Sequence, residues 1–411
     1  AWHRRADATA AAGERLLAFC AGPATDAALT VEGIGPGLVF IGLVGFIDPP
    51  RPEAITAIAE CRQAGIAVKM ITGDHAATAA AIARQLGLDD APVVVTGAEI
   101  DAEPDETLAD FVTPVSVFAR TSPEHKLRIV RALQSTGAIV AMTGDGVNDA
   151  PSLKQADVGV AMGHKGTEAA KEAAQVVLLD DNFASIVAAV HEGRTVYDNI
   201  RKVIAWTLPT NGGEALAVIA AILLGFTMPM SAVQILWVNL ITAVTLGLVL
   251  AFEPAEPGVM RRRPRDPRAG LLSPFLLWRV LFVSTLFLGG ALGAFFGALG
   301  EGYSLAKART LVVNVVVVFE IFYLFNVRYL HGGSLTLRGF FGTPAVLIAL
   351  GSVTLAQLAF TYLPPMQALF ETEAISLRDG LLVIAAGVVL MLVLEIEKAV
   401  LRRFGLFGMG V

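Results

Sequence analysis

The chain has 411 residues, of which 55% are hydrophobic and only 17% are charged, a balance more apolar than that of soluble globular domains. The 40 glycines and 20 prolines follow no repeat, which excludes a collagen-like chain. The formal net charge of −6 argues against nucleic acid as a partner, because such partners attract basic surfaces. The two cysteines, Cys20 and Cys61, are too few for a disulfide framework or a zinc cluster, and we expect small buried thiols.

The charged residues crowd before about residue 205, which predicts a soluble part followed by a membrane part. In the soluble part, apolar runs predict buried strands at residues 38–47, 67–71, 93–95, 115–119, 138–142, 158–161 and 176–179. Helical patterns lie between several of them, at residues 51–64, 75–86 and 123–133. This alternation predicts a doubly wound parallel sheet with its site at the carboxyl ends of the strands.

Six apolar stretches are each long enough to cross a bilayer, which takes about 20 residues. They lie at about residues 203–225, 231–252, 275–299, 308–327, 343–363 and 380–400. A helix that begins near Phe183 is expected to continue into the first of them as a stalk, because no helix breaker precedes Pro209. Basic residues follow the second, fourth and sixth stretches, at Arg261, Arg262, Arg263, Arg265, Arg268, Arg328, Arg338, Lys398, Arg402 and Arg403. The bias places the soluble part and the C-terminus in the cytoplasm.

The octapeptide at residues 142–149 follows one predicted strand and opens a helix. Its two carboxylates, Asp145 and Asp149, are suited to Mg²⁺ together with water and phosphate oxygens. Gly144 and Gly146 let the backbone approach a ligand closely. The alternative interpretation is a turn with an aspartate helix cap.

Two further positions follow strands in the same way. Thr72-Gly73-Asp74 ends one strand and starts a helix, where a hydroxyl and backbone N–H groups suit a phosphate. Lys126 lies one turn into a helix after another strand and can neutralise a phosphoryl group as a point charge. Taken singly, each also fits an ordinary role, as a helix cap and as a solvated surface lysine.

Thr72, Lys126 and the run Gly-Asp-Gly-x-x-Asp, in this order, resemble the haloacid dehalogenase superfamily. More narrowly, the runs at residues 48–51, 72–74 and 143–151 are similar to those of P-type cation-transporting ATPases. The resemblance continues through residues 180–183, 192–194, 197–199 and 237–240 and covers essentially the whole chain. The subgroup that the chain resembles is the type II pumps for calcium or for sodium and potassium.

The resemblance implies a haloacid-dehalogenase-like α/β cytoplasmic domain followed by an all-α domain of six transmembrane helices. Residues 1–37 would be the end of a nucleotide-binding domain, 38–190 the phosphorylation domain without its nucleophile segment, and 191–411 the stalk and spans. Asp145 and Asp149 would hold the catalytic Mg²⁺, with Asn148 nearby, and Thr72 and Lys126 would contact the phosphoryl group. Gly73, Asp74 and Arg120 would border the ATP, and Arg15 matches a nucleotide-contacting arginine.

Polar side chains inside the spans are functional candidates, because their burial in hydrocarbon is unfavourable. They are Asn211 and Glu214 in the first span, Asn239 and Thr242 in the second, and Glu320 in the fourth. Oxygen ligands suit a hard cation, and hydrogen bonding between helices is the alternative.

Pro209, Gly212 and Gly213 are expected to loosen the first span and to free carbonyl oxygens for the ion. All five polar positions match calcium-pump ligands. Ala243, however, stands where those pumps place an aspartate, which puts calcium selectivity in doubt.

The chain also departs from the family pattern. The family's nucleophile is the aspartate of D-K-T-G-T, and the nearest imitation here, at residues 7–9, lacks the lysine. The expectation is therefore the C-terminal portion of an ATP-driven cation pump, inactive by itself, whose partners are ATP, an inorganic cation, the bilayer and the N-terminal half of the same pump. Its Ala- and Arg-rich composition suggests a bacterial plasma membrane. The alternatives are a membrane-anchored phosphatase of the dehalogenase superfamily and a passive transporter with a regulatory cytoplasmic module.

Overall fold

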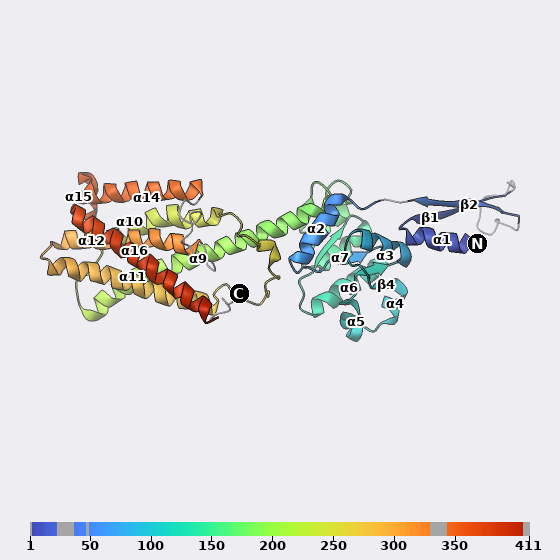
Figure 1. The fold of residues 1–411 in the computed structure, drawn as a ribbon, viewed down its shortest axis with the longest axis horizontal. Helices are drawn as coiled ribbons and strands as arrows, with labels where there is room; N and C mark the ends of the chain where they lie inside the picture. Colours follow the sequence, from blue (N-terminus) through green and yellow to red (C-terminus); the bar gives the residue numbers. More distant parts are fainter. Residues whose placement is uncertain (1, 23–36, 47–48, 329–342, 406–411) are drawn as a thin grey trace. The chain divides into compact units, whose positions relative to one another are not determined.

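The computed structural model describes residues 2–22, 37–46, 49–328 and 343–405 (Figure 1). The chain divides into two compact units. The first comprises Ala1–Glu192 and Pro257–Pro267, and the second comprises Gly193–Glu256 and Arg268–Val411. Each is described by itself. Of the positions singled out above, Asp48 and Arg338 and the side chain of Arg15 lie outside the described part.

The strands of the first unit form three small sheets. β3 (Met70–Ile71), β5 (Val117–Ala119) and β4 (Val94–Thr96) form a parallel sheet in the order β3-β5-β4. β6 (Ala141–Gly144), β7 (Val158–Met162) and β8 (Val176–Leu178) form a second parallel sheet in that order. β1 (Arg15–Ala21) and β2 (Val39–Phe46) pair antiparallel as a separate hairpin. Parallel strands joined through helices are confirmed, but in the described residues they form two three-stranded sheets rather than one.

Helices connect the strands of this unit and bury its cores. They are α1 (Trp2–Ala11), α2 (Pro52–Gln63), α3 (Ala76–Gln85), α4 (Gly97–Ala102), α5 (Asp105–Val112), α6 (Pro123–Ser135), α7 (Ala150–Gln155) and α8 (Glu168–Ala173), with the 3₁₀ turns η2 (Val147–Asp149) and η5 (Val259–Arg261). α6 begins where its sequence signals a start: Pro123 is its first residue, and the Ser122 hydroxyl accepts a hydrogen bond from the His125 amide. Phe118 and Ile129 pack in the core of one sheet, and Met142 and Leu153 in that of the other.

Two expectations for this unit were wrong. The apolar run at residues 38–47 is not a buried strand: within it, β2 pairs with β1, and most of its residues are exposed. Continuous apolar character signals burial, but it does not say what covers the strand. Cys61 is buried as expected, whereas Cys20, on β1, is exposed.

The second unit is a helical bundle. Its helices are α9 (Phe183–Leu224), which begins in the first unit, α10 (Ala232–Thr242), α11 (Pro274–Gly300), α12 (Leu305–Val327), α14 (Pro344–Tyr362), α15 (Pro364–Phe370) and α16 (Leu377–Arg403). A π-helical turn, η3 (Ala243–Gly247), and a 3₁₀ turn, η4 (Leu250–Phe252), continue α10. In the described chain, six helical segments are long and apolar enough to cross a membrane, and they coincide with the six predicted spans.

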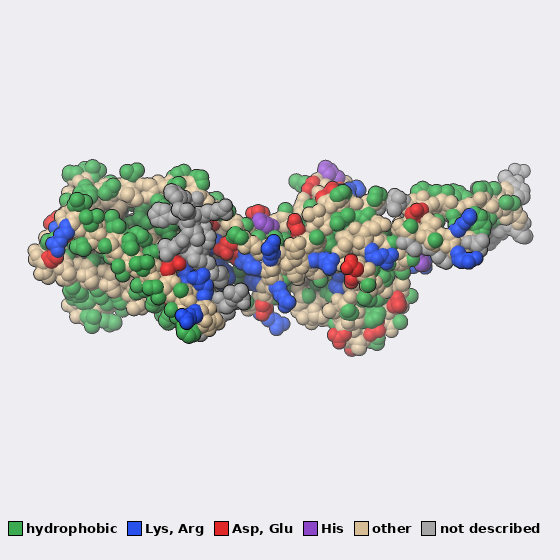
Figure 2. All heavy atoms as spheres, viewed as in Figure 1, with side chains coloured by type: hydrophobic (Ala, Val, Ile, Leu, Met, Phe, Trp, Pro, Cys, Tyr) green, Lys and Arg blue, Asp and Glu red, His purple; other side chains and the backbone are tan. Residues whose placement is uncertain are grey.

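The outer surface of the bundle is apolar. Leu223, Leu236, Ile348 and Leu355 are each at least 68% exposed, and Figure 2 shows hydrophobic side chains over most of the visible face of the bundle, with charged ones toward its ends. α12 lies at the centre, since 78% of its most apolar stretch is buried against 28–33% for the other five segments. An apolar exterior around a buried central helix is the arrangement expected for a bundle surrounded by lipid.

The expectation that Pro209, Gly212 and Gly213 open the first span was wrong. α9 runs unbroken through them. A Cβ atom added to Gly213 would lie 2.4 Å from Cβ of Phe287 on α11, so this glycine lets two helices approach closely. Proline cannot donate to the carbonyl four residues before it, and the Ala205 carbonyl instead accepts a hydrogen bond from the Tyr323 hydroxyl of α12 at 2.7 Å.

This packing predicts opposite effects for one substitution at two positions of α9. Gly213→Ala should destabilise the protein by about 1–3 kcal/mol, because the methyl group overlaps Phe287 and forces a backbone shift. Gly193→Ala is the matched control, because a Cβ there meets nothing within 4 Å and alanine favours the helix by about 1 kcal/mol. Thermal unfolding in detergent measures both. Equal midpoints for the two variants would contradict the close approach.

Candidate functional site

The loop after β6 is organised around the carboxylate of Asp149. Asp149 is buried, and its Oδ2 accepts hydrogen bonds from the backbone N–H groups of Asp145 at 3.2 Å and Gly146 at 3.1 Å. A Cβ atom on Gly144 would lie 2.5 Å from Cβ of Asp149, so the chain needs glycine there to pass over this side chain. Asp145 and Asn148 are exposed on the same loop.

Lys126 joins this loop from α6. Its ammonium group donates to Oδ1 of Asp149 at 2.6 Å. Burial alone would raise the pKa of Asp149, but the hydrogen bonds from Lys126 and from the Gly146 N–H outweigh it and hold the pKa below its usual value. Asp149 is therefore ionised at neutral pH. The structure brings these two predicted site residues into direct contact.

Thr72 and its neighbours form a second turn, at the end of β3. The Thr72 hydroxyl donates to Oδ2 of Asp74 at 3.0 Å and accepts from the Asp74 N–H at 3.1 Å. The Thr72 N–H donates to the Phe118 carbonyl at 2.9 Å, and the Arg120 N–H donates to the Asp74 carbonyl at 3.1 Å. These bonds link the ends of β3 and β5. Gly73 and the side chain of Arg120 are exposed. Among the described residues, no hydrogen bond joins Thr72 to Lys126, Asp145 or Asp149.

The donor set at the β6 loop fits a hydrated Mg²⁺. Asp145 offers an exposed carboxylate, and Asp149 adds a second one that is already ionised. No group of three or more His, Cys, Asp or Glu side chains suited to a metal occurs in the described residues. Most coordination positions would therefore fall to water and phosphate oxygens, which is the usual way that Mg²⁺ is held.

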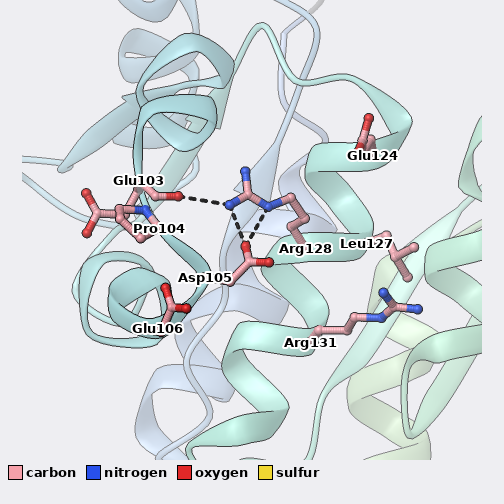
Figure 3. A pocket seen from close by; sticks show the side chains of 8 residues that line it. All are labelled: Glu103, Pro104, Asp105, Glu106, Glu124, Leu127, Arg128 and Arg131. Atoms are coloured by element: carbon pink, nitrogen blue, oxygen red, sulfur yellow. Dashed lines mark hydrogen bonds and ion pairs between the residues drawn. The ribbon is translucent and has the colours of Figure 1, made fainter.

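A surface pocket of about 470 Å³ lies elsewhere in the first unit, along α5 and α6 (Figure 3). Arg128 lies across it and donates to Asp105 at 2.6 Å and to the Glu103 carbonyl at 2.9 Å. The lining residues include none of those singled out in the sequence. Because Arg128 is already paired within the protein, we do not assign a ligand to this pocket.

Polar residues from three helices meet in the interior of the second unit. Glu214 of α9 is 5% exposed, and its Oε2 accepts a hydrogen bond from the Asn239 amide of α10 at 2.7 Å. Glu320 of α12 is 2% exposed and lies close enough to Glu214 for their charges to act on each other. Thr242 of α10 is buried near Glu320, and its hydroxyl donates to the Val238 carbonyl of its own helix at 2.9 Å. Four of the five predicted side chains are thus brought together.

Each of the two carboxylates keeps one buried oxygen without a partner. These atoms are Oε1 of Glu214 and Oε2 of Glu320. A buried carboxylate oxygen without a hydrogen bond is unfavourable, so the pair is suited to accept a cation or protons. The fifth predicted residue, Asn211, is exposed in the described chain and is not part of this cluster, and Ala243 opens the π-helical turn.

Sequence reasoning missed Trp206 and Tyr323, which lie beside this cluster. The Trp206 indole N–H donates to the Glu320 carbonyl at 3.2 Å, and Tyr323 satisfies the carbonyl that Pro209 leaves without its helical donor. Pro209 was the available signal, because a proline inside a span requires a donor from another helix for the carbonyl four residues earlier.

Family profiles match both parts of the chain. Residues 227–400 match the C-terminal region of cation-transporting ATPases, and residues 13–157 and 127–190 match haloacid dehalogenase-like hydrolases. The chain is 49% identical over 377 residues to "Probable cation-transporting ATPase F" of Mycobacterium tuberculosis. The chain belongs to the cation-transporting P-type ATPases. The haloacid-dehalogenase-like fold and the helical membrane region expected from sequence are confirmed.

Other relatives share the same pattern of coverage. A "Calcium-transporting ATPase 1" of Bacillus cereus is 42% identical over 93% of this chain, and a cation-transporting ATPase of Synechocystis is 45% identical over 82%. The match to the mycobacterial protein covers 90% of this chain. The matched region is 42%, 45% and 38% of the mycobacterial, Bacillus and Synechocystis proteins. The chain therefore spans less than half the length of these relatives.

The Lys126–Asp149 pair predicts a pH-dependent stability. Lys126→Met leaves the Asp149 charge buried without its partner and should reduce the free energy of unfolding by about 1–3 kcal/mol at pH 7. Because the pKa of Asp149 is lowered in the fold, its contribution is present above its unfolded-state pKa of about 4 and is lost as pH falls through the folded-state value. The loss caused by the substitution should therefore shrink on acidification.

Thermal unfolding of the detergent-solubilised chain across pH measures this effect. Lys171→Met is the matched control, because Lys171 pairs with the exposed Glu168 at 3.0 Å and exposed pairs contribute below about 1 kcal/mol. A Lys126→Met loss that is no larger than the control, or that does not depend on pH, would show that the pair does not stabilise the loop.

Proposed function

We propose that the chain is part of an ATP-driven cation pump, in which Mg²⁺-dependent phosphoryl transfer is coupled to movement of an inorganic cation across a membrane. One observation supports this most directly. One chain contains both an ion pair between Lys126 and Asp149, in the loop that follows a parallel strand, and two buried glutamates within apolar helices. Each glutamate keeps one carboxylate oxygen without a hydrogen-bond partner. A membrane-anchored phosphatase has no use for the second feature, and a passive transporter has none for the first.

In the first unit, Lys126 and the β6 loop would act on the phosphoryl group. The ammonium group of Lys126 neutralises phosphoryl charge, and Asp149 fixes where that ammonium lies. Asp145 and Asp149 would hold Mg²⁺, which supplies charge neutralisation at the phosphate oxygens when bound. Thr72, with its hydroxyl oriented by Asp74, would contact the same group. Asn148, Gly73, Asp74, Arg120 and Arg15 would border the nucleotide.

The proposed domains follow the same scheme. Residues 1–37 would be the end of a nucleotide-binding domain, 38–190 the phosphorylation domain, and 191–411 the stalk and spans. The exposed apolar residues of β1 support the first assignment: Leu17 is 51% exposed and Phe19 is 46% exposed. Faces of this kind are normally covered, and we propose that the rest of a nucleotide-binding domain covers them. The soluble unit and the C-terminus would lie in the cytoplasm, at a bacterial plasma membrane.

In the second unit, Glu214, Asn239, Thr242 and Glu320 would hold the transported cation, and the exposed Asn211 would lie outside this set. The unsatisfied oxygens of the two glutamates are the anionic ligands, the Asn239 amide orients Glu214, and the Thr242 hydroxyl oxygen adds a neutral ligand. Oxygen ligands of this kind suit hard cations such as Ca²⁺, Mn²⁺, Na⁺ or K⁺.

Neutralising either glutamate should weaken the response of the ATPase to the cation. In the full-length protein, Glu214→Gln and Glu320→Gln should each raise the cation concentration for half-maximal ATPase stimulation at least tenfold, because each removes an anionic ligand. Glu301→Gln, at an exposed helix end, is the matched control. Phosphate release is measured across Ca²⁺, Mn²⁺, Na⁺ and K⁺. Unchanged stimulation in both glutamate variants would contradict the proposed site.

Position 243 tests the charge of the site. Ala243→Asp adds a carboxylate beside Thr242 and should raise the apparent affinity for Ca²⁺ about tenfold relative to Na⁺ and K⁺, because a divalent ion gains more from an added charge. Ala243→Asn has nearly the same shape without the charge and is the control. Equal effects of the two substitutions, or no change in the Ca²⁺ response, would show that position 243 does not face the cation.

A further inference from the structure

We propose that Trp206 and Tyr323 are positioning residues that fix the spacing of Glu214 and Glu320 and thereby the affinity for the cation. This inference rests on the proposed function. It starts from two hydrogen bonds that run in opposite directions between α9 and α12. Tyr323 of α12 donates to the Ala205 carbonyl of α9, and Trp206 of α9 donates to the Glu320 carbonyl of α12.

The tyrosine bond cannot be replaced within α9. Pro209 has no N–H, so the Ala205 carbonyl lacks its helical donor. Tyr323 is 0% exposed and Ala205 is 1% exposed, so bulk water does not reach this carbonyl. A buried carbonyl without a partner is unfavourable, and the hydroxyl therefore holds α12 at one level along α9. The guanidinium group of Arg279, from α11, lies over the same ring, 5.8 Å from its centre.

The tryptophan contacts all three helices that supply cation ligands. It belongs to α9, two turns before Glu214 on the same helical face. Its N–H reaches the backbone of Glu320 itself, at 3.2 Å. Its ring packs against Gly247, where an added Cβ would lie 3.3 Å from Cζ3, and Gly247 ends the π-helical turn that follows Thr242. Trp206 is 2% exposed, so a shift of its ring moves one of these neighbours.

The two carboxylates repel each other when both are ionised. The Asn239 amide holds one oxygen of Glu214, but no hydrogen bond among the described residues joins the two carboxylates to each other. The two hydrogen bonds between α9 and α12 set the distance between the backbones that carry the two carboxylates. Cation affinity depends on this distance, because ligand distances differ by tenths of an ångström between ions. Loosening these hydrogen bonds should weaken binding while leaving the chemistry of phosphoryl transfer unchanged.

The first test removes one hydroxyl. In the full-length protein, Tyr323→Phe should raise the Ca²⁺ or Mn²⁺ concentration for half-maximal ATPase stimulation about fivefold, the size expected for one lost hydrogen bond, with an unchanged maximal rate. Tyr362→Phe is the control for loss of a tyrosine hydroxyl outside this cluster, because Tyr362 also donates to a backbone carbonyl, that of Ile375 at 3.2 Å, from a side chain that is 46% exposed. Trp206→Phe should act in the same direction, because it removes the indole bond to the Glu320 carbonyl.

The second test is compensation. Gly247→Ala presses a methyl group on the Trp206 ring and should also raise the half-maximal concentration. The smaller ring of Trp206→Phe leaves room for this methyl group. The double variant should therefore raise the half-maximal cation concentration by less than the product of the two single fold-changes. Purely additive effects would overturn the role of the ring.

The remaining outcomes separate the inference from the proposed function. A cation response that Tyr323→Phe and Tyr362→Phe change equally, or a fall in maximal rate at unchanged half-maximal concentration, would overturn the positioning role alone. A full-length protein whose ATPase activity responds to none of Ca²⁺, Mn²⁺, Na⁺ and K⁺ would overturn the proposed function, and this inference with it.

Discussion

The constraint on which the membrane unit depends is that polar groups inside an apolar bundle must find their partners within the protein. Pro209 breaks this rule locally, and Tyr323 restores it from another helix. The two terminal nitrogens of the fully buried Arg279 are paired in the same way, with Glu397 of α16 and Asn326 of α12. Among the described residues, buried side-chain atoms without a partner occur on Asn199, Arg279 and Gln357 and on the carboxylates of Glu214 and Glu320. Only the two glutamates bring unsatisfied carboxylate oxygens to neighbouring positions, and such a pair is suited to a cation.

Asp149 in the first unit and the pair Glu214 and Glu320 in the second differ in how completely their carboxylate oxygens are hydrogen-bonded, and this difference suits them to different roles. Asp149 has both oxygens occupied, one by Lys126 and one by backbone N–H groups, and its pKa is lowered accordingly. It is a permanently charged residue that organises a loop, and a ligand there must share or displace an existing bond. Glu214 and Glu320 are only partly satisfied, and each can accept a cation without breaking a bond first. A fixed charge suits phosphoryl chemistry that repeats at one place, whereas an incomplete shell suits an ion that binds and leaves.

The sequence predicted most of the architecture, because six long apolar segments and alternating strand and helix patterns leave few folds open. Its errors share one cause. The apolar run around Phe40 and the glycine at 213 are local signals whose meaning is set by partners distant in the chain. A run of apolar residues indicates a strand that another part of the protein must cover, but it does not say which part. A glycine in a helix indicates either a weakened helix or a closely packed neighbour, and at Gly213 only the contact with Phe287 distinguishes these two interpretations. For the same reason the polar residues of the spans could be found from composition, but Trp206 could not, since an indole in a span is usually only apolar bulk.

The alanine at 243 changes what must determine selectivity. Where a site holds three carboxylates, a divalent ion is favoured by charge alone, whatever the exact spacing. The described cluster holds two carboxylates, one amide and one hydroxyl, and two charges neutralise one divalent ion or leave a monovalent ion in excess negative charge. Discrimination then depends on geometry, that is, on how far Glu214 can move relative to Glu320. A π-helical turn begins at Ala243, where the carboxylate is absent, and ends at Gly247, which packs against the Trp206 ring. The same short segment therefore contains the alanine and a contact of the residue that positions Glu320. A site with fewer charges needs a stiffer frame, and the opposed hydrogen bonds between α9 and α12 supply it.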